Sequence, residues 1–217
     1  MDGSLLKGSS SDLPALPYPG CYVRGMRTDP GTQIAELRPG DAAGAAAAQR
    51  LLNQGLGDGM YGVDGLLADA GEPTAGVWLA RAGDAAAGAA VARLLVPDDA
   101  SYYRRFGPEA TGLFGGTVGS FEGLAIDPAF RRRGIGTGLT RASLDWMRAQ
   151  GCDAAVAIAW LSGRPDSSPP LFRHLGFREG PTVERFYAEE SVENDWSCPV
   201  CGQPCVCAAT FFALPLR

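Results

Sequence analysis

Short apolar runs alternate with helix-like segments along most of the chain, and glycine, proline or aspartate separates them. The pattern predicts strands at 32–37, 76–82, 87–96, 117–126, 154–160, 182–189 and 208–216. Helices are predicted at 41–53, at 135–150 and at 170–175, with Gly55 ending the first. Residues 98–116 are predicted to be an irregular connection. This order predicts an α+β fold, in which helices cover both faces of a mixed sheet.

Length and composition limit the class of protein. The chain has 217 residues, 46% of them hydrophobic, enough for one domain with a substantial core. We expect a partly flexible arm at 1–30 and one domain at 31–217. A net charge of −5 disfavours a nucleic-acid partner. No apolar stretch is long enough for a membrane span, and the start lacks signal-peptide features, so we expect a cytoplasmic protein with no membrane partner.

The segment after the predicted strand 117–126 has the chemistry of an anion site. Three arginines, Arg131–Arg133, precede glycines 134, 136 and 138 at the start of a predicted helix. Main-chain N–H groups at a helix start attract phosphate, and glycines let it approach closely. The glycines do not follow the G-x-G-x-x-G spacing of dinucleotide folds, and the Gly-Lys-Ser/Thr of a Walker loop is absent. The segment therefore predicts a pyrophosphate cradle.

The amino-acid sequence of this predicted cradle resembles a motif of one known family. Residues 131–136, Arg-Arg-Arg-Gly-Ile-Gly, match the R/Q-x-x-G-x-G/A signature of the GNAT superfamily of acetyl-CoA-dependent N-acyltransferases. Residues 171–177, Leu-Phe-Arg-His-Leu-Gly-Phe, resemble the family's L-Y-x-x-x-G-F segment. The order of predicted elements is similar to the family's fold over about 31–217.

The resemblance implies a GNAT fold whose mixed central sheet is splayed between strands 4 and 5, with the pantetheine arm of acetyl-CoA between them. It implies that main-chain groups of 124–126 meet the pantetheine and that N–H groups of 132–138 hold the pyrophosphate. The implied acetyl-CoA-binding residues are Leu124, Ala125, Ile126, Arg131, Arg132, Arg133, Gly134, Ile135, Gly136, Thr137, Gly138 and Phe172.

Catalysis in this family removes a proton from the amine and returns one to the leaving thiolate. The resemblance implies Glu122 as the base; otherwise this carboxylate faces a neighbouring strand or solvent. Phe172 occupies the position of the family's proton-donating tyrosine and has no proton to give. Tyr102, Tyr103 and Tyr187 are alternative acids, unless each serves only in packing.

Four cysteines, Cys198, Cys201, Cys205 and Cys207, fall within ten residues. Cys-Pro-x-Cys-Gly is the turn of a zinc knuckle, and four thiolates would make a closed, structural zinc site. Free or disulfide-forming thiols are the alternative. We expect the site within an insertion at about 195–207 that joins the last two strands.

The leading hypothesis is an N-acetyltransferase that moves the acetyl group of acetyl-CoA to a primary amine of a small molecule or a protein. We expect its acceptor site from residues 50–75, 97–116 and the last hairpin, with acidic residues that suit a cation: Asp58, Asp64, Asp98, Asp99 and Glu109. The alternative is a non-catalytic acyl-CoA-binding module whose zinc hairpin contacts a protein. A zinc-ribbon nucleic-acid binder is disfavoured by the net charge. Nothing in the sequence decides between a monomer and a homodimer.

Overall fold

The computed structural model describes residues 31–164 and 167–217, so the arm predicted at 1–30 lies outside the described residues. The strands are β1 (Thr32–Glu36), β2 (Ala75–Ala82), β3 (Ala85–Leu94), β4 (Val118–Ile126), β5 (Ala154–Leu161), β6 (Arg178–Val183) and β7 (Ala208–Pro215). The α-helices are α1 (Ala42–Leu56), α2 (Val63–Asp69), α3 (Ala100–Tyr103), α4 (Pro108–Gly112), α5 (Ile135–Ala149), α6 (Pro169–His174) and α7 (Ala188–Glu193).

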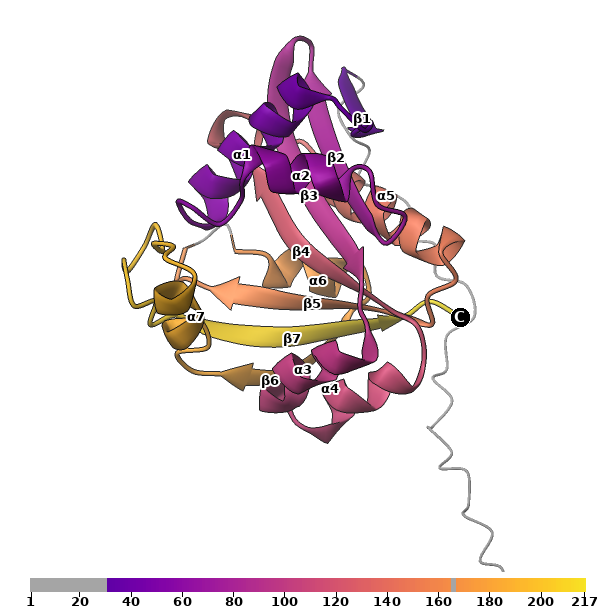
Figure 1. Cartoon of the computed structure of the whole chain (residues 1–217), viewed down its shortest axis with the longest axis vertical. Coiled ribbons are helices and arrows are strands. Elements are labelled where there is room, and N and C mark those ends of the chain that lie inside the picture. Colours follow the sequence, from indigo (N-terminus) through magenta and orange to yellow (C-terminus); the bar gives the residue numbers. More distant parts are fainter. Residues whose placement is uncertain (1–30, 165–166) are drawn as a thin grey trace, which may run out of the picture.

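All the strands form one sheet in the order β1-β2-β3-β4-β5-β7-β6. Neighbouring strands are antiparallel except β4 and β5, which are parallel. Figure 1 shows α1 to α4 in front of the sheet and α5 and α6 behind it. The core is divided accordingly, because Leu79 and Val91 pack under α1 whereas Trp78 and Ala90 pack under α5. The predicted mixed sheet with helices on both faces is therefore confirmed.

The sheet opens between β4 and β5. Their parallel pairing covers only residues 118–121 and 154–157. Just beyond it, Glu122 forms a β-bulge, since Ala92 pairs with Phe121 and Val91 pairs with Gly123. A bulge bends its strand and increases the local twist. The second half of β4 consequently stays paired with β3 and leaves β5, so the two strands splay apart as the resemblance implied.

The helix α1 begins as predicted but ends later. The Asp41 carboxylate accepts a hydrogen bond from the Gly44 N–H at 2.9 Å and caps the helix. The helix continues through Gly55 to Leu56, so Gly55 does not end it. A Cβ atom at Gly55 would lie 2.9 Å from the Cβ of Ala125 on β4. Gly55 is thus required by the close approach of α1 to the sheet.

Three other segments differ from the sequence-based expectation. The short helix α2 (63–69) was not predicted, because seven residues give little helical periodicity. The connection 98–116 is largely helical, with α3 and α4 flanked by single 3₁₀ turns. The strand predicted at 182–189 ends at Val183, because Arg185 has a left-handed backbone (φ 52°) and α7 follows. Its apolar residues, Phe186 and Tyr187, pack against α3 and neighbouring loops instead.

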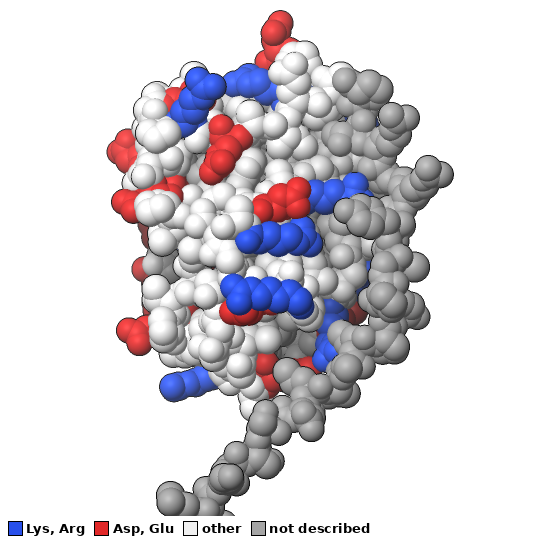
Figure 2. All heavy atoms as spheres, turned by 90° about the vertical axis from the view of Figure 1, so that its right-hand side faces the viewer, with Lys and Arg blue, Asp and Glu red and all other residues white. Residues whose placement is uncertain are grey.

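Among the described residues, no helix is long and apolar enough to cross a membrane. Figure 2 shows the face on the right of Figure 1, where α5 lies. Basic and acidic side chains lie beside one another there rather than gathering into a patch of one sign.

Candidate active site

A cavity of about 840 Å³ occupies the opening between β4 and β5. It has two ends, which we call the glycine end and the acidic end. The glycine end is lined by Leu124, Ala125, Ile126, Arg131, Arg132, Gly134, Ile135, Gly136, Thr137, Leu171 and Phe172. The acidic end is lined by Met60, Tyr61, Asp69, Arg93, Asp99, Tyr102, Tyr103, Ser120, Glu122, Trp160, Tyr187, Glu190 and Trp196. One cavity therefore joins the predicted phosphate cradle to the predicted base.

The glycine end is shaped by the turn from β4 into α5. Asp127 caps a 3₁₀ turn (Pro128–Phe130) by accepting from the Ala129 N–H at 2.8 Å. Arg132 (φ 64°) and Gly134 (φ 76°) then adopt left-handed backbone conformations that start α5. The first N–H groups of α5 consequently meet the cavity, where a helix dipole favours an anion.

Two of the residues assigned to the cradle, Gly138 and Arg133, form hydrogen bonds within the protein. The Gly138 N–H donates to the Gly134 carbonyl at 2.9 Å, so it is used within the helix and not offered to a ligand. The Arg133 guanidinium donates to the Ala129 carbonyl at 3.2 Å and lies 5.2 Å from the ring centroid of Phe130. Arg133 is not part of the cavity lining, whereas Arg131 and Arg132 are.

One wall of the glycine end is aromatic. Phe172 of α6 is 3% exposed and packs against Phe121, Phe177 and Phe212, with ring centroids 5.1 to 5.9 Å apart. The ring also borders the cavity. This position gives the site an apolar side wall and, as the sequence indicated, no hydroxyl.

Glu122 lies at the bulge, between the two ends of the cavity. The Tyr61 hydroxyl donates to its main-chain carbonyl at 2.6 Å. Tyr61 is itself held by Asn53 of α1, which bonds both its N–H (2.9 Å) and its carbonyl (3.0 Å). The bulge is therefore fixed by side chains from α1 and the loop that follows it.

Glu122 is solvent-exposed on β4, and its side chain lines the cavity, where the surrounding protein partly desolvates the carboxyl. This desolvation raises the pKa of the Glu122 carboxyl above its usual range, while a hydrogen bond from Ser120 and the charge of Arg93 oppose the rise. Ser120 is buried and lies 3.1 Å from the Tyr103 hydroxyl. A chain of polar groups thus leads from Glu122 into the core.

Other charges at the acidic end are partly compensated. Asp69 and Arg93 form an ion pair at 2.6 Å. Asp99 accepts from the Val96 N–H at 2.7 Å, and Glu190 accepts from the Tyr102 hydroxyl at 2.7 Å. Burial raises the pKa of Tyr102 above its usual value, so this phenol stays a donor. Four carboxylates, those of Asp69, Asp99, Glu122 and Glu190, lie in this part of the lining together with Arg93.

The expected segments build the acidic end, but most of the expected acids do not line it. Asp99 does; the others, Asp58, Asp64, Asp98 and Glu109, do not. Sequence reasoning missed Asp69, Arg93 and Glu190. Arg93 gave a usable signal, since a charged residue near the end of an apolar strand needs a partner.

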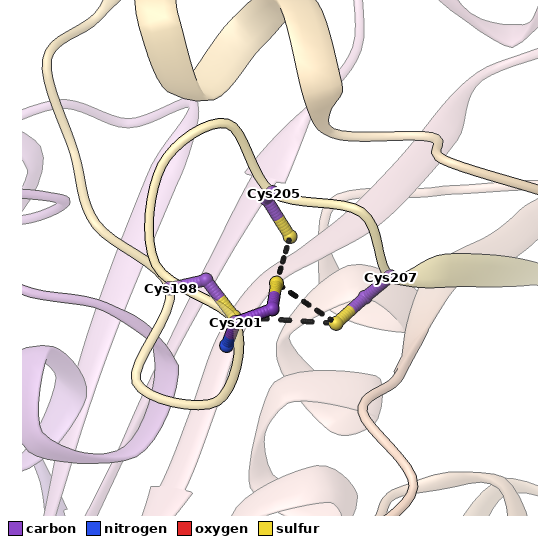
Figure 3. A group of neighbouring side chains, drawn as sticks. All are labelled: Cys198, Cys201, Cys205 and Cys207. Carbon is purple, nitrogen blue, oxygen red and sulfur yellow. Dashed lines mark hydrogen bonds between the residues drawn. The ribbon is translucent and has the colours of Figure 1, made fainter.

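The cysteines converge beside this end. Figure 3 shows Cys198, Cys201 and Cys205 from the loop after α7 and Cys207 just before β7, with their sulfurs directed toward one another. All four sulfurs lie within 4.8 Å of one another. The predicted grouping of four thiols is therefore present in the structure.

The comparisons with known proteins agree with this architecture. The acetyltransferase (GNAT) family matches residues 46–177, more than half of the chain, and the chain belongs to this family. No match is found among curated proteins.

Several solved structures share the fold. The ribosomal-protein-S18-alanine N-acetyltransferase from Escherichia coli is 16% identical, with a TM-score of 0.56 over 86% of this chain and 94% of that chain. Arabidopsis thaliana NAA60 in complex with acetyl-CoA is 14% identical, with a TM-score of 0.61 over 85% and 98%. A GNAT family acetyltransferase from Elizabethkingia anophelis with acetyl-CoA bound is 15% identical, with a TM-score of 0.58 over 86% and 99%.

Proposed function

We propose that the protein is an acetyl-CoA-dependent N-acetyltransferase. The observation that carries the proposal is the continuity of one cavity from the amide-rich start of α5 to Glu122, across the opening between β4 and β5. Solved structures of the same fold were obtained with acetyl-CoA bound. Family membership supplies the reaction class, and the cavity supplies places for both reactants.

Acetyl-CoA binding follows from the lining of the glycine end. The pyrophosphate is held by N–H groups at Gly134, Ile135 and Gly136, with the charge of Arg131 and Arg132 nearby. The pantetheine lies along residues 124–126, whose edge toward β5 is open because the strands have parted. The amides of such an edge pair with a ligand as they would with a strand.

The transfer step then runs in the acidic end. A neutral amine attacks the thioester carbonyl; a C–N bond forms and the C–S bond breaks, releasing the thiolate of coenzyme A. Glu122 accepts the proton of the amine, directly or through water, because its raised pKa brings it closer to that of the amine. The thiolate receives its proton from solvent or from a tyrosine of the acidic end, since Phe172 cannot supply one.

The acceptor is a primary amine that is cationic in solution. The four carboxylates of the acidic end favour entry of a positive charge, and the aromatic walls favour an apolar body behind it. The charge pattern fits a small-molecule amine and a protein amine alike. The proposal also includes a zinc ion at the four cysteines, structural because four thiolates leave no open position, and a cytoplasmic location, where thiols stay reduced.

A non-catalytic acyl-CoA-binding module is the second candidate, and Phe172 is the observation that favours it. The test is a paired measurement on the full chain: acetyl-CoA affinity by titration calorimetry, and thiol release with spermidine, tyramine and an alanine-terminated tetrapeptide. Binding with turnover of at least one amine supports the enzyme. Binding without turnover supports the module, and no binding contradicts both.

A further inference from the structure

The segment 195–207, which we call the cysteine loop, is tied to two parts of the cavity wall. Ser191 of α7 is fully buried, and its hydroxyl accepts from the Cys205 N–H at 2.9 Å. The Gln203 side chain donates to the Ser191 carbonyl. On the other side, the Ser197 N–H donates to the Asp58 carbonyl at 3.3 Å, in the connection between α1 and α2. The loop therefore links α7 to the segment that presents Met60 and Tyr61.

The distances between the sulfurs match a metal cage. The sulfur of Cys201 lies 3.6 Å from that of Cys207 and 3.8 Å from that of Cys205, and Cys198 lies 4.0 Å from Cys207. Four sulfurs about 2.3 Å from a central zinc ion would be about 3.8 Å apart at the corners of a tetrahedron. A disulfide needs about 2.05 Å, so the spacing fits an ion at the centre rather than paired sulfurs.

Main-chain donors point at the same sulfurs. The N–H groups of Val200 and Cys201 donate to the Cys198 sulfur at 3.4 Å, and the Val206 N–H donates to the Cys201 sulfur at 3.3 Å. Such donors stabilise negative thiolates more than neutral thiols. Several thiolates this close together require a cation, because their mutual repulsion is otherwise uncompensated.

A fourth donor comes from the sheet. The indole nitrogen of Trp160 on β5 is buried and, within residues 31–164 and 167–217, has no partner in normal hydrogen-bond geometry. The Trp160 side chain packs against the cluster that contains Cys198, Cys205 and Cys207. A buried donor without an acceptor is costly, and a metal-bound thiolate would satisfy it. This unpartnered donor beside the cysteines is a second observation, independent of the cysteine spacing, that points to a bound ion.

The same side chains form part of the acidic end. Trp196 is 5% exposed and packs on the cysteines together with Met60, Trp160 and Tyr187. All four also line the cavity. Tyr187 and Trp196 meet edge to face, with ring centroids 6.0 Å apart. The cysteines thus pack behind an aromatic wall, and the other surface of this wall lines the acidic end of the cavity.

We propose that one Zn²⁺ bound by Cys198, Cys201, Cys205 and Cys207 holds this aromatic wall in place and thereby sets the affinity for the acceptor amine. Binding to four thiols releases four protons and involves no change of oxidation state. The effect on acceptor affinity rests on the proposed function. The metal content and the packing of the wall can be measured without assuming that function. The glycine end lies on the far side of Glu122, so acetyl-CoA binding does not depend on the ion.

The first test concerns the metal. Full-length protein purified under reducing conditions should hold about one zinc per chain, and Cys205→Ser should lose it. Cys152→Ser, a buried cysteine outside the cluster, is the matched control and should keep it. Replacement by Co²⁺ should produce thiolate-to-metal charge-transfer absorption. Less than about 0.2 zinc per chain, with all four thiols titratable, overturns the proposal.

The second test concerns the wall. Zinc removal should change the tryptophan fluorescence of the native protein but not that of a Trp160→Phe, Trp196→Phe double variant, because the remaining pair, Trp78 of β2 and Trp146 of α5, lies in a different core cluster. With the best amine of the panel above, Cys205→Ser should raise KM at least about tenfold while the Kd for acetyl-CoA stays within about threefold. Bound zinc whose loss changes neither fluorescence nor KM overturns the role of the wall. Loss of acetyl-CoA binding by the native protein instead contradicts the proposed function and leaves both metal readouts intact.

Discussion

Glu122 owes its place to one extra residue in β4. Without the bulge, successive side chains of β4 would alternate regularly between the two faces of the sheet. The Glu122 carboxyl would then have no special placement at the point where β4 leaves β5. The Tyr61 hydroxyl secures the carbonyl of this same residue. The bulge thus couples the splay of the sheet to the placement of the base.

Glu122→Gln should lower kcat/KM about 10²- to 10⁴-fold, as is typical when a general base is lost. Desolvation raises the pKa of the carboxyl, so the active carboxylate forms only above that raised pKa and is lost as the pH falls through it. The loss caused by the substitution should therefore be greatest at high pH and shrink at low pH. A pH profile of both proteins checks this. A variant within about threefold of wild type at every pH would show that Glu122 is not the base.

Gly136 allows a graded test of the glycine end. An added Cβ would lie 3.6 Å from Leu171, an ordinary contact, so the protein itself tolerates alanine. Gly136→Ala should raise the unfolding free energy by up to about 1 kcal/mol through helix propensity, yet weaken acetyl-CoA binding. Gly136→Leu should weaken it by more than about tenfold, because the side chain would fill the mouth of the cavity. Titration calorimetry and thermal melts measure both quantities; unchanged affinity in Gly136→Leu would refute the cradle.

At the residue scale, the sequence predicted functional residues that lie together in one contiguous motif. It did not predict residues whose partners are distant in the sequence. The cradle and the cysteines are local in sequence, so their grouping was predictable. The bond inside α5 that uses the Gly138 N–H was not, because it depends on where the helix begins. Asp69 and Glu190 gave no signal, since the partners that bind them at the cavity, Arg93 and Tyr102, are distant in the sequence.

At the element scale, the long periodic segments and the short helix α6 were predictable, whereas the other short helices were not. The face of α5 formed by Ile135, Leu139, Ala142 and Trp146 packs on the sheet as expected. The helices α2, α3, α4 and α7, with four to seven residues each, are stabilised by tertiary contacts that no short window shows. The prediction that Gly55 ends α1 was wrong, because glycine is typical both of the end of a helix and of a close contact between a helix and a sheet.

Gly55→Ala tests that contact. Alanine favours a helix by about 0.5 to 1 kcal/mol over glycine, but here its Cβ would press on Ala125 at 2.9 Å and push α1 from β4. We expect the variant to be less stable than wild type in urea unfolding. Gly65→Ala in α2, where nothing lies within 4 Å, is the control and should be slightly more stable. Equal stabilisation of both variants would mean that α1 does not rest on β4 so closely.

At the scale of the whole molecule, the sheet consists of two halves. Within the described part of the chain, strand pairing joins the half with β1 to β4 to the half with β5 to β7 only between 118–121 and 154–157. The facing edges beyond this pairing border the cavity. A ligand seated there contacts both halves and supplies the contacts that the parted strands lack.

Acetyl-CoA should therefore stabilise the fold and order this opening. At a concentration 100-fold above Kd, mass action contributes about 2.7 kcal/mol, which for a chain of this size raises Tm by roughly 5–10 °C. In hydrogen exchange, protection should rise at residues 122–126 and 158–161, on the two edges that have parted, and stay constant in the β1–β2 pairing, which lies outside the cavity. Because Gly136→Leu occupies the cradle, it should abolish both effects at the same ligand concentration. Stabilisation of the wild type without added protection at both edges would place the coenzyme elsewhere on the molecule.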